Sequence, residues 1–145
     1  MERGILADHS IRALSGTNAA KSFMGMGAHV TVLDTNLNAL VTIIDQLPGI
    51  STMVSNTVNV EAACTFADIL VGAVLIPGER PPIIVTREML RIMKPRSVVM
   101  DISIDEGGCI ETSRMTTHEK PTYIDEGIIH YCVPNISSVV ARTAT

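Results

Sequence analysis

The residues of this chain that could do chemistry follow its apolar runs, where a strand ends and a loop begins. Asp34 comes directly after the β-rich run 30–33, and Gly16, 18 residues earlier, opens a helical pattern. A small residue there allows a helix to pack closely on a strand, while a carboxylate at the next strand end can accept hydrogen bonds from ribose hydroxyls. The same carboxylate repels a 2′-phosphate. The pair predicts a nucleotide-type ligand and favours NAD over NADP.

The glycine turn that should precede Gly16 is altered in this sequence. A dinucleotide fingerprint has two further glycines, and their positions hold Ile11 and Ala13. Side chains there block the close backbone approach to a pyrophosphate that glycine permits, so we expect NADH binding to be weak. Two other interpretations stay open. Asp34 could simply lie beside a helix N-terminus, and a methyltransferase also places an acid after its second strand.

Helix and strand patterns alternate through the part of the chain that must position these residues. Four segments have apolar residues at helical spacing: 16–24, 37–47, 59–66 and 86–93. Four others are apolar or β-rich runs of strand length: 30–34, 50–55, 69–75 and 98–102. Asn59 and Thr86 are the expected N-caps of the last two helices. Alternation of this kind implies right-handed crossovers, so the expected fold class is α/β, a doubly wound, mostly parallel sheet of the Rossmann type.

The two ends of the chain fit this alternation less well. The first, central strand of such a sheet and its glycine turn are altered or missing, because residues 7–14 replace the apolar run that should stand there. Toward the other end, 123–124 and 129–133 flank a turn-like segment and could pair as a hairpin or run separately. We expect a single NAD(P)-binding domain over 1–145, with 1–15 as an atypical lead-in and without a substrate domain.

Composition and charge argue against several classes of protein. A chain of 145 residues with 46% hydrophobic residues can bury one core but not the two domains of cleft-type dehydrogenases. A net charge of -4 and only two Phe and two Tyr, without Trp, argue against nucleic acid. The longest apolar run, 69–77, is about half of the roughly 20 residues that cross a bilayer, so no membrane span is expected. Three cysteines in apolar stretches and an N-terminus without an apolar signal core favour a reducing, cytoplasmic location.

Several segments match one known family in order and spacing. They are Gly16-Thr17-Asn18-Ala19-Ala20-Lys21, 27–34, 72–78, Met93-Lys94-Pro95, Asp105-Glu106-Gly107-Gly108-Cys109 with Glu111 and Ser113, and His130-Tyr131-Cys132-Val133. By these segments the chain resembles alanine dehydrogenase, of the alanine dehydrogenase and pyridine nucleotide transhydrogenase family. The resemblance covers about 16–145, and 101–111 is its most specific part.

The resemblance implies an oxidoreductase domain with an NAD site. The family reaction is the reversible, NAD-dependent oxidative deamination of L-alanine to pyruvate and ammonium, a step of L-alanine catabolism carried out by a cytoplasmic homo-oligomer. The implied cofactor contacts are Ser15, Gly16, Asp34, Ser55, Val74, Leu75, Ile102, Ser103, Ile104, Asp105, Arg114, Val133, Pro134, Asn135 and Ile136. Asp105 is the implied catalytic residue, which helps to manage the proton of the imine and carbinolamine steps together with a histidine from a separate substrate domain. We expect the chain alone to be inactive, because that histidine and the cationic substrate clamp are not among its residues.

Ordinary structural roles compete with these assignments. Without the resemblance, Asp105 in a Gly-rich loop would be a turn-forming acid. His118 and His130 are expected to be a solvated and a packed histidine rather than catalytic groups. No metal is expected, since the cysteines and histidines lack the close pairs that structural zinc sites use. The methionines at 24, 26, 89 and 93 are expected to fill the core.

Two other functions stay open at this point. One is a non-catalytic or degenerate module that binds nucleotide weakly or only mediates assembly, and the altered glycine turn supports it. The other is the soluble subunit of a proton-pumping transhydrogenase, which shares this ancestry but presents a different partner surface. The short links between helices and strands favour the dehydrogenase.

Overall fold

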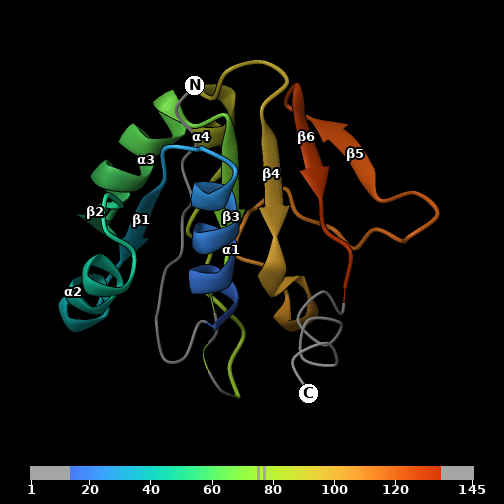
Figure 1. Ribbon diagram of the computed structural model, residues 1–145. Coiled ribbons are helices and arrows are strands. Elements are labelled where there is room, and N and C mark those ends of the chain that lie inside the picture. Colours follow the sequence, from blue (N-terminus) through green and yellow to red (C-terminus); the bar gives the residue numbers. More distant parts are fainter. Residues whose placement is uncertain (1–13, 75, 77, 135–145) are drawn as a thin grey trace.

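Helices and strands alternate along the chain as the sequence predicts (Figure 1). The computed structural model describes residues 14–74, 76 and 78–134. The helices are α1 (Leu14–Gly25), α2 (Leu37–Gln46), α3 (Thr57–Phe66), α4 (Arg87–Arg91) and the 3-10 helix η1 (Ile102–Glu106). The strands are β1 (Thr31–Asp34), β2 (Ser51–Val54), β3 (Ile69–Gly72), β4 (Val98–Asp101), β5 (Thr122–Asp125) and β6 (Ile128–Tyr131). The altered first strand that the sequence predicts falls on residues outside the described ones.

The strands form two groups of hydrogen-bonded neighbours within the described part of the chain. β1 and β2 pair in parallel, and the other four follow the order β3-β4-β6-β5. β3, β4 and β6 are parallel, whereas β5 pairs antiparallel with β6, so the hairpin alternative is the one that forms. Figure 1 shows β1, β3, β4 and β6 running in one direction, toward the lower side of the view. Their carboxyl ends therefore lie at one edge of the molecule.

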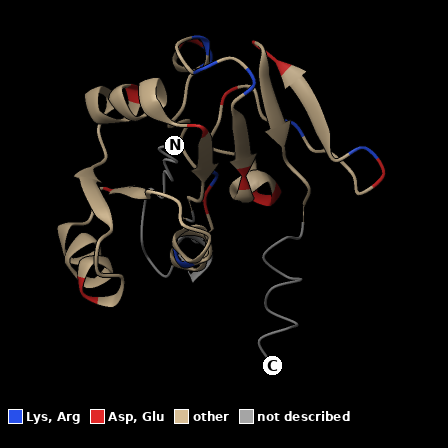
Figure 2. Ribbon diagram, turned by 45° about the horizontal axis from the view of Figure 1, so that its top comes forward, with Lys and Arg blue, Asp and Glu red and all other residues tan. Residues whose placement is uncertain are grey.

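Charged side chains are spread over the described elements and do not gather by sign (Figure 2). Several of them join α4 to the turn between β5 and β6. Arg87 lies 2.9 Å from a carboxylate oxygen of Asp125 and 3.0 Å from one of Glu126, which Arg91 also approaches to 3.1 Å. These side chains are partly exposed, so each pair contributes little to stability and the network acts mainly as a tie between the two elements.

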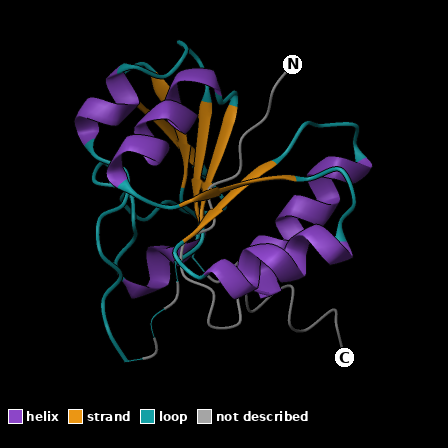
Figure 3. Ribbon diagram, turned by 90° about the vertical axis from the view of Figure 1, so that its left-hand side faces the viewer, coloured by secondary structure: helices purple, strands orange, loops and turns teal. Residues whose placement is uncertain are grey.

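Helices cover both faces of the strands, which confirms the doubly wound α/β class (Figure 3). On one face, Ala20 of α1 and Leu40 of α2 pack in a core cluster with Val32 of β1 and Val71 of β3. On the other face, α3 and α4 pack against β3 and β4 in a second, larger cluster. β1 and β3 thus share a core although no ladder joins them among the described residues. None of the described helices combines the length and apolar character needed to span a membrane.

The start of α3 differs from the sequence prediction. Asn56, not Asn59, is its N-cap, and the Asn56 side chain accepts a hydrogen bond from the Asn59 backbone N–H at 2.8 Å. The Asn59 side chain instead donates to the carbonyl of Val54 at 2.8 Å. Both asparagines suit a cap, and the helix begins at the earlier one because β2 ends at Val54 and the chain turns there. The prediction for Thr86 is confirmed, since its hydroxyl accepts from the N–H of Met89.

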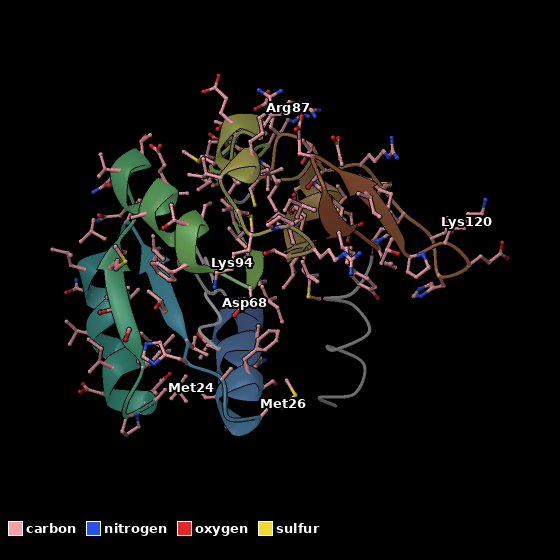
Figure 4. All side chains as sticks on the ribbon, turned by 90° about the horizontal axis from the view of Figure 1, so that it is seen from above. Met24, Met26, Asp68, Arg87, Lys94 and Lys120 are labelled. Carbon is pink, nitrogen blue, oxygen red and sulfur yellow. The ribbon has the colours of Figure 1, made fainter. Side chains whose placement is uncertain are left out.

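Met26 and Lys94 lie just beyond the ends of α1 and α4 (Figure 4). Met26 is 65% exposed, so the prediction that it fills the core is wrong, while Met89 and Met93 are buried. α4 ends at Arg91, and Lys94 lies beyond it. The Lys94 ammonium reaches the carbonyl of Phe66, the last residue of α3, at 3.2 Å and Asp68 at 3.4 Å. A cation there satisfies a C-terminal carbonyl of a neighbouring helix rather than of its own.

Candidate functional site

The edge at which the parallel strands end is where ligands bind in open α/β sheets. Figure 1 shows that α1 begins and η1 lies at this edge. The first turn of α1 contains Ser15 and Gly16, and the Ser15 side chain is outside the described ones. Backbone N–H groups at the start of a helix point outward and favour an anion such as a pyrophosphate. The contacts of Ser15 and Gly16 with the cofactor stay a prediction.

Asp34 and Ser55 come together at the ends of β1 and β2. The Ser55 N–H donates to the carbonyl of Asp34 at 2.9 Å, and the Asp34 side chain, only 5% exposed, accepts from the N–H of Asn36 at 2.9 Å. Asn36 is the N-cap of α2. Asp34 therefore has the structural role beside a helix N-terminus that the sequence left open. Such a role also fixes the orientation of the carboxylate at the strand end.

Asp101, the last residue of β4, is a residue to which the sequence assigned no function. It is fully buried. Its Oδ1 accepts from the N–H of Ser103 at 3.0 Å, and its Oδ2 accepts from the N–H groups of Cys109 at 3.0 Å and Ile110 at 3.2 Å. One carboxylate thus holds both ends of the loop that includes η1. The sequence signal for this role was an acid at the end of an apolar strand. A carboxylate in such a place is rarely buried unless several N–H or O–H groups donate hydrogen bonds to it.

Ser103 links this loop to the segment that follows β3. Its Oγ accepts from the Val74 N–H at 2.6 Å and donates to the Val74 carbonyl at 2.7 Å. Both residues are almost completely buried. The family resemblance implies that Ser103 and Val74 both contact the cofactor, and the structure brings these two residues together. The Ser103 hydroxyl, however, already uses its one donor and one acceptor position in hydrogen bonds to the Val74 backbone.

The glycines of the loop are required by its geometry. Gly107 and Gly108 have φ angles of 115° and 81°, a region that side-chain-bearing residues rarely adopt. A Cβ on Gly108 would lie 2.8 Å from Oδ2 of Asp101, and one on Gly107 would lie 2.7 Å from Nε of Arg80. A Cβ on Gly72 would overlap the sulfur of Cys109. The Gly-Gly pair therefore allows the chain to turn back tightly over the Asp101 carboxylate.

Asp105, the predicted catalytic residue, lies within η1 and is exposed. Its neighbours differ from it, because Ile104 is 5% exposed and anchors the loop in the interior, while Ile102 is half-buried. Burial and the negative charge of Asp101 raise the pKa of the nearby Cys109 thiol well above its ordinary value, so that this cysteine stays neutral. The loop presents the carboxylates of Asp105 and Glu106 to solvent from a framework fixed at both ends.

Arg114 is held by the hairpin rather than by the strand ends. Its guanidinium lies 4.1 Å from the centre of the Tyr123 ring, which stacks on His130 with 4.8 Å between centroids. His130 is fully buried; its Nδ1 lies 2.8 Å from the Ile128 carbonyl and its Nε2 lies 2.6 Å from the Thr112 hydroxyl. A carbonyl only accepts, so Nδ1 carries the proton and Nε2 accepts from the hydroxyl. Burial lowers the pKa of this histidine from its ordinary 6.5, which favours the neutral ring.

The remaining predicted residues divide between described and undescribed positions. Val133 is buried and Pro134 half-buried just after β6, at the same edge as η1. Leu75, Asn135 and Ile136 lie outside the described residues. His118 is exposed and His130 is packed, as the sequence predicted. No cluster of three or more histidine, cysteine or acidic side chains suited to a metal occurs in the described part of the chain.

Comparison with known proteins gives one consistent family. The family model described as Alanine dehydrogenase/PNT, C-terminal domain matches residues 13–145. The chain is 48% identical over 131 residues to the alanine dehydrogenase of Halomonas elongata, and that of Bacillus subtilis is 48% identical over 133 residues. Each alignment covers 90% of this chain but 35% of the relative, so the chain spans about a third of the relatives' length.

Solved structures agree with the sequence relatives. An L-alanine dehydrogenase superposes with a TM-score of 0.88 and 38% identity over 99% of this chain and 39% of the other. The transhydrogenase from Sinorhizobium meliloti superposes with a TM-score of 0.82 and 27% identity over 98% of this chain and 40% of the other. The predicted family and the predicted fold class are both confirmed. The chain belongs to the alanine dehydrogenase and pyridine nucleotide transhydrogenase family and corresponds to its C-terminal domain.

Proposed function

We propose that this chain, as a single domain over 1–145, is the NAD-binding part of an alanine dehydrogenase-like oxidoreductase. The complete enzyme would deaminate L-alanine reversibly to pyruvate and ammonium, as the family resemblance implies. One observation carries the proposal: three segments assigned to the cofactor from the sequence, after β1, β3 and β4, lie at the same edge of the molecule as the start of α1 (Figure 1). By similarity to the NAD-dependent relatives, this edge would bind the NAD that takes part in the dehydrogenase reaction.

Each part of this edge suits one part of a dinucleotide. Asp34, fixed by its bond to the N–H of Asn36, would accept hydrogen bonds from the adenine ribose, with Ser55 beside it. The start of α1 would face the pyrophosphate through its N–H groups. η1 and the segment after β6 would frame the nicotinamide. NAD, when bound, supplies the hydride acceptor.

Asp105 is the residue that we assign to proton handling. It is exposed on η1, as is the adjacent Glu106, whereas Asp101 and Asp34 are buried and bonded to backbone N–H groups. The family resemblance, rather than exposure, distinguishes Asp105 from Glu106. A carboxylate can take a proton from the substrate, or give one to it, only where the substrate can reach its oxygens. L-alanine would be held by groups from the remainder of the enzyme, since the matched region is about a third of each relative. Assembly as a homo-oligomer and a cytoplasmic location are further parts of this proposal.

Cofactor selectivity tests the proposal directly. The chain should bind NADH more tightly than NADPH, because Asp34 repels a 2′-phosphate. Asp34→Asn keeps the size of the side chain and an acceptor for Asn36 but removes the charge, so it should narrow the preference. Asp45→Asn removes an exposed carboxylate from the same helix-strand unit, on α2, and serves as the control. Equal affinities of the unaltered chain for both cofactors would contradict the assignment of Asp34.

A degenerate module is the second candidate, favoured by Ile11 and Ala13 in place of the fingerprint glycines. Such a module would bind nucleotide weakly or only mediate assembly, and in the second case it would bind neither NADH nor ADP-ribose at millimolar concentrations of ligand. Titration monitored by NADH fluorescence and by calorimetry separates the two candidates. A transhydrogenase-type role would require a different partner protein. Oxidation of L-alanine by an enzyme that contains this domain would argue against that role.

A further inference from the structure

We propose that Asp101 and Ser103 are positioning residues that fasten the loop after β4 to the segment after β3, so that both walls of the nicotinamide end move as one unit. The assignment rests on the proposed function, because the two walls are the segments expected to face the nicotinamide. Neither side chain needs to touch the cofactor for this role. Their hydrogen bonds to the backbone are what fasten the two segments.

Ser103 completes the ladder between β3 and β4 with its side chain. The paired register runs from Ile69 opposite Val98 to Gly72 opposite Asp101, and its continuation would place Val74 opposite Ser103. The backbone has by then turned into η1 and cannot pair. The Ser103 Oγ takes its place, accepting from the N–H and donating to the carbonyl of Val74 at 2.6 and 2.7 Å. A single hydroxyl thus bonds to both backbone polar groups of a buried residue.

Asp101 fixes the other side of the same unit. Its carboxylate accepts from the N–H of Ser103, at the start of the loop, and from those of Cys109 and Ile110, at its end. Hydrogen bonds to an ionised acceptor are stronger than neutral ones, and this acceptor is fully buried. The Gly108 backbone passes so close to Oδ2 that no Cβ fits. The loop cannot shift without breaking several of these bonds together.

The two sets of bonds share Ser103. Its N–H donates to Asp101, and its hydroxyl bonds to the backbone of Val74. A movement of η1 therefore also moves the segment after β3, and a movement of that segment also moves η1. Cys109 adds a packed contact, because its sulfur occupies the space over Gly72. Exposed Asp105 is carried on this unit. Reacting groups must be held within a fraction of an ångström, which a loop tied to one strand only would not achieve.

Ser103→Ala is the decisive variant, and Ser97→Ala is its matched control. Ser97 is also a buried serine whose hydroxyl donates to backbone carbonyls, those of Lys94 and Ala67, but it precedes β4 and lies at the opposite end of that strand. Both variants should lower stability. Only Ser103→Ala should speed hydrogen exchange of the Val74 amide, by about tenfold or more beyond the change in global stability, because that N–H loses its partner.

Ligand binding provides the readout that a merely structural role would not move. Ser103→Ala should weaken NADH by about tenfold, or about 1.4 kcal/mol, while ADP-ribose, which lacks the nicotinamide, should change by less than about twofold. Asp101→Asn should act in the same direction and also speed exchange at Cys109 and Ile110. Equal losses for the two ligands, or a Val74 amide that exchanges as in Ser97→Ala, would overturn the proposal. Failure of the unaltered chain to bind either ligand counts against the proposed function, and exchange at Val74 then decides the positioning role by itself.

Discussion

Gly108→Ala should be far more destabilising than alanine at other glycines with positive φ. Gly108 has a φ angle of 81°, and its added Cβ would lie 2.8 Å from Oδ2 of Asp101. Gly127, in the β5–β6 turn, has a φ angle of 73° but no atom within 4 Å of the added Cβ. The two sites therefore differ in the steric contact and share the backbone cost. Alanine at Gly107 should cost about as much as at Gly127, because its added Cβ meets Arg80, an exposed side chain that can move away.

The magnitude follows from these two contributions. A residue with a Cβ in the left-handed region costs about 1–2 kcal/mol, which applies to Gly127→Ala, Gly107→Ala and Gly108→Ala alike. At Gly108 the carboxylate must also move, and its Oδ2 is held by the N–H groups of Cys109 and Ile110. Breaking one hydrogen bond to a charged, buried acceptor costs about 1.5–3 kcal/mol more. We expect a total loss of about 2.5–5 kcal/mol for Gly108→Ala and about 1–2 kcal/mol for the other two.

Urea unfolding measures this difference as a change in midpoint at constant m-value. The Gly108→Ala protein should unfold at clearly lower urea than Gly107→Ala and Gly127→Ala, which should be alike. A chain of this length should also lose a few degrees of melting temperature per kcal/mol, roughly 3–5 °C. If all three variants lose the same free energy of unfolding, the close approach of Gly108 to Asp101 does not constrain the loop, and the reasoning about its framework fails.

Three further predictions concern pH, turnover and affinity. Burial lowers the pKa of His130, so the unfolded state binds protons first on acidification, and the free energy of unfolding should fall as the pH drops from about 7 to 5. His130→Phe should reduce that dependence in urea titrations at each pH, whereas His118→Phe, at an exposed site, should leave it in place. The chain alone should form no NADH from saturating L-alanine at alkaline pH by absorbance at 340 nm, and turnover abolished by Asp105→Asn would show that the chain holds a complete active site. NADH should bind more weakly than about micromolar by calorimetry, and combined Ile11→Gly and Ala13→Gly should tighten it.

The alternation of elements could be predicted from sequence because each element carries its own local signal. The Thr86 cap of α4, the helical spacing of α2 and the apolar run of β4 need no distant residue for their effect. Errors occurred where two local signals competed. Asn56 and Asn59 both suit an N-cap, and the end of β2 decided between them. Met26 has the spacing of a core residue, but α1 ends at Gly25 and leaves it exposed.

The hairpin and the framework of the site depend on contacts between distant segments, which spacing does not encode. The hairpin required the turn at Glu126 and Gly127, both with positive φ, and also the place of β6 beside β4. The hydroxyl of Ser103 meets Val74 29 residues earlier in the chain. Sequence patterns indicated that each segment faces the ligand edge. They did not indicate that the two are bonded to each other.

Ser103 and Asp105 show why similarity to a family does not by itself assign roles within a site. Both lie in η1, two positions apart, and both were expected to contact the cofactor because the family match covers them equally. Ser103 is 1% exposed and gives its hydroxyl to the backbone of Val74, whereas Asp105 is exposed to solvent. A side chain committed to the fold influences a ligand through the groups that it holds, while an exposed one can meet the ligand itself. The exposed carboxylates of this loop are those of Asp105 and Glu106, of which the family resemblance assigns Asp105 to chemistry. Asp101, four residues before Asp105, belongs to the framework that holds the loop in place.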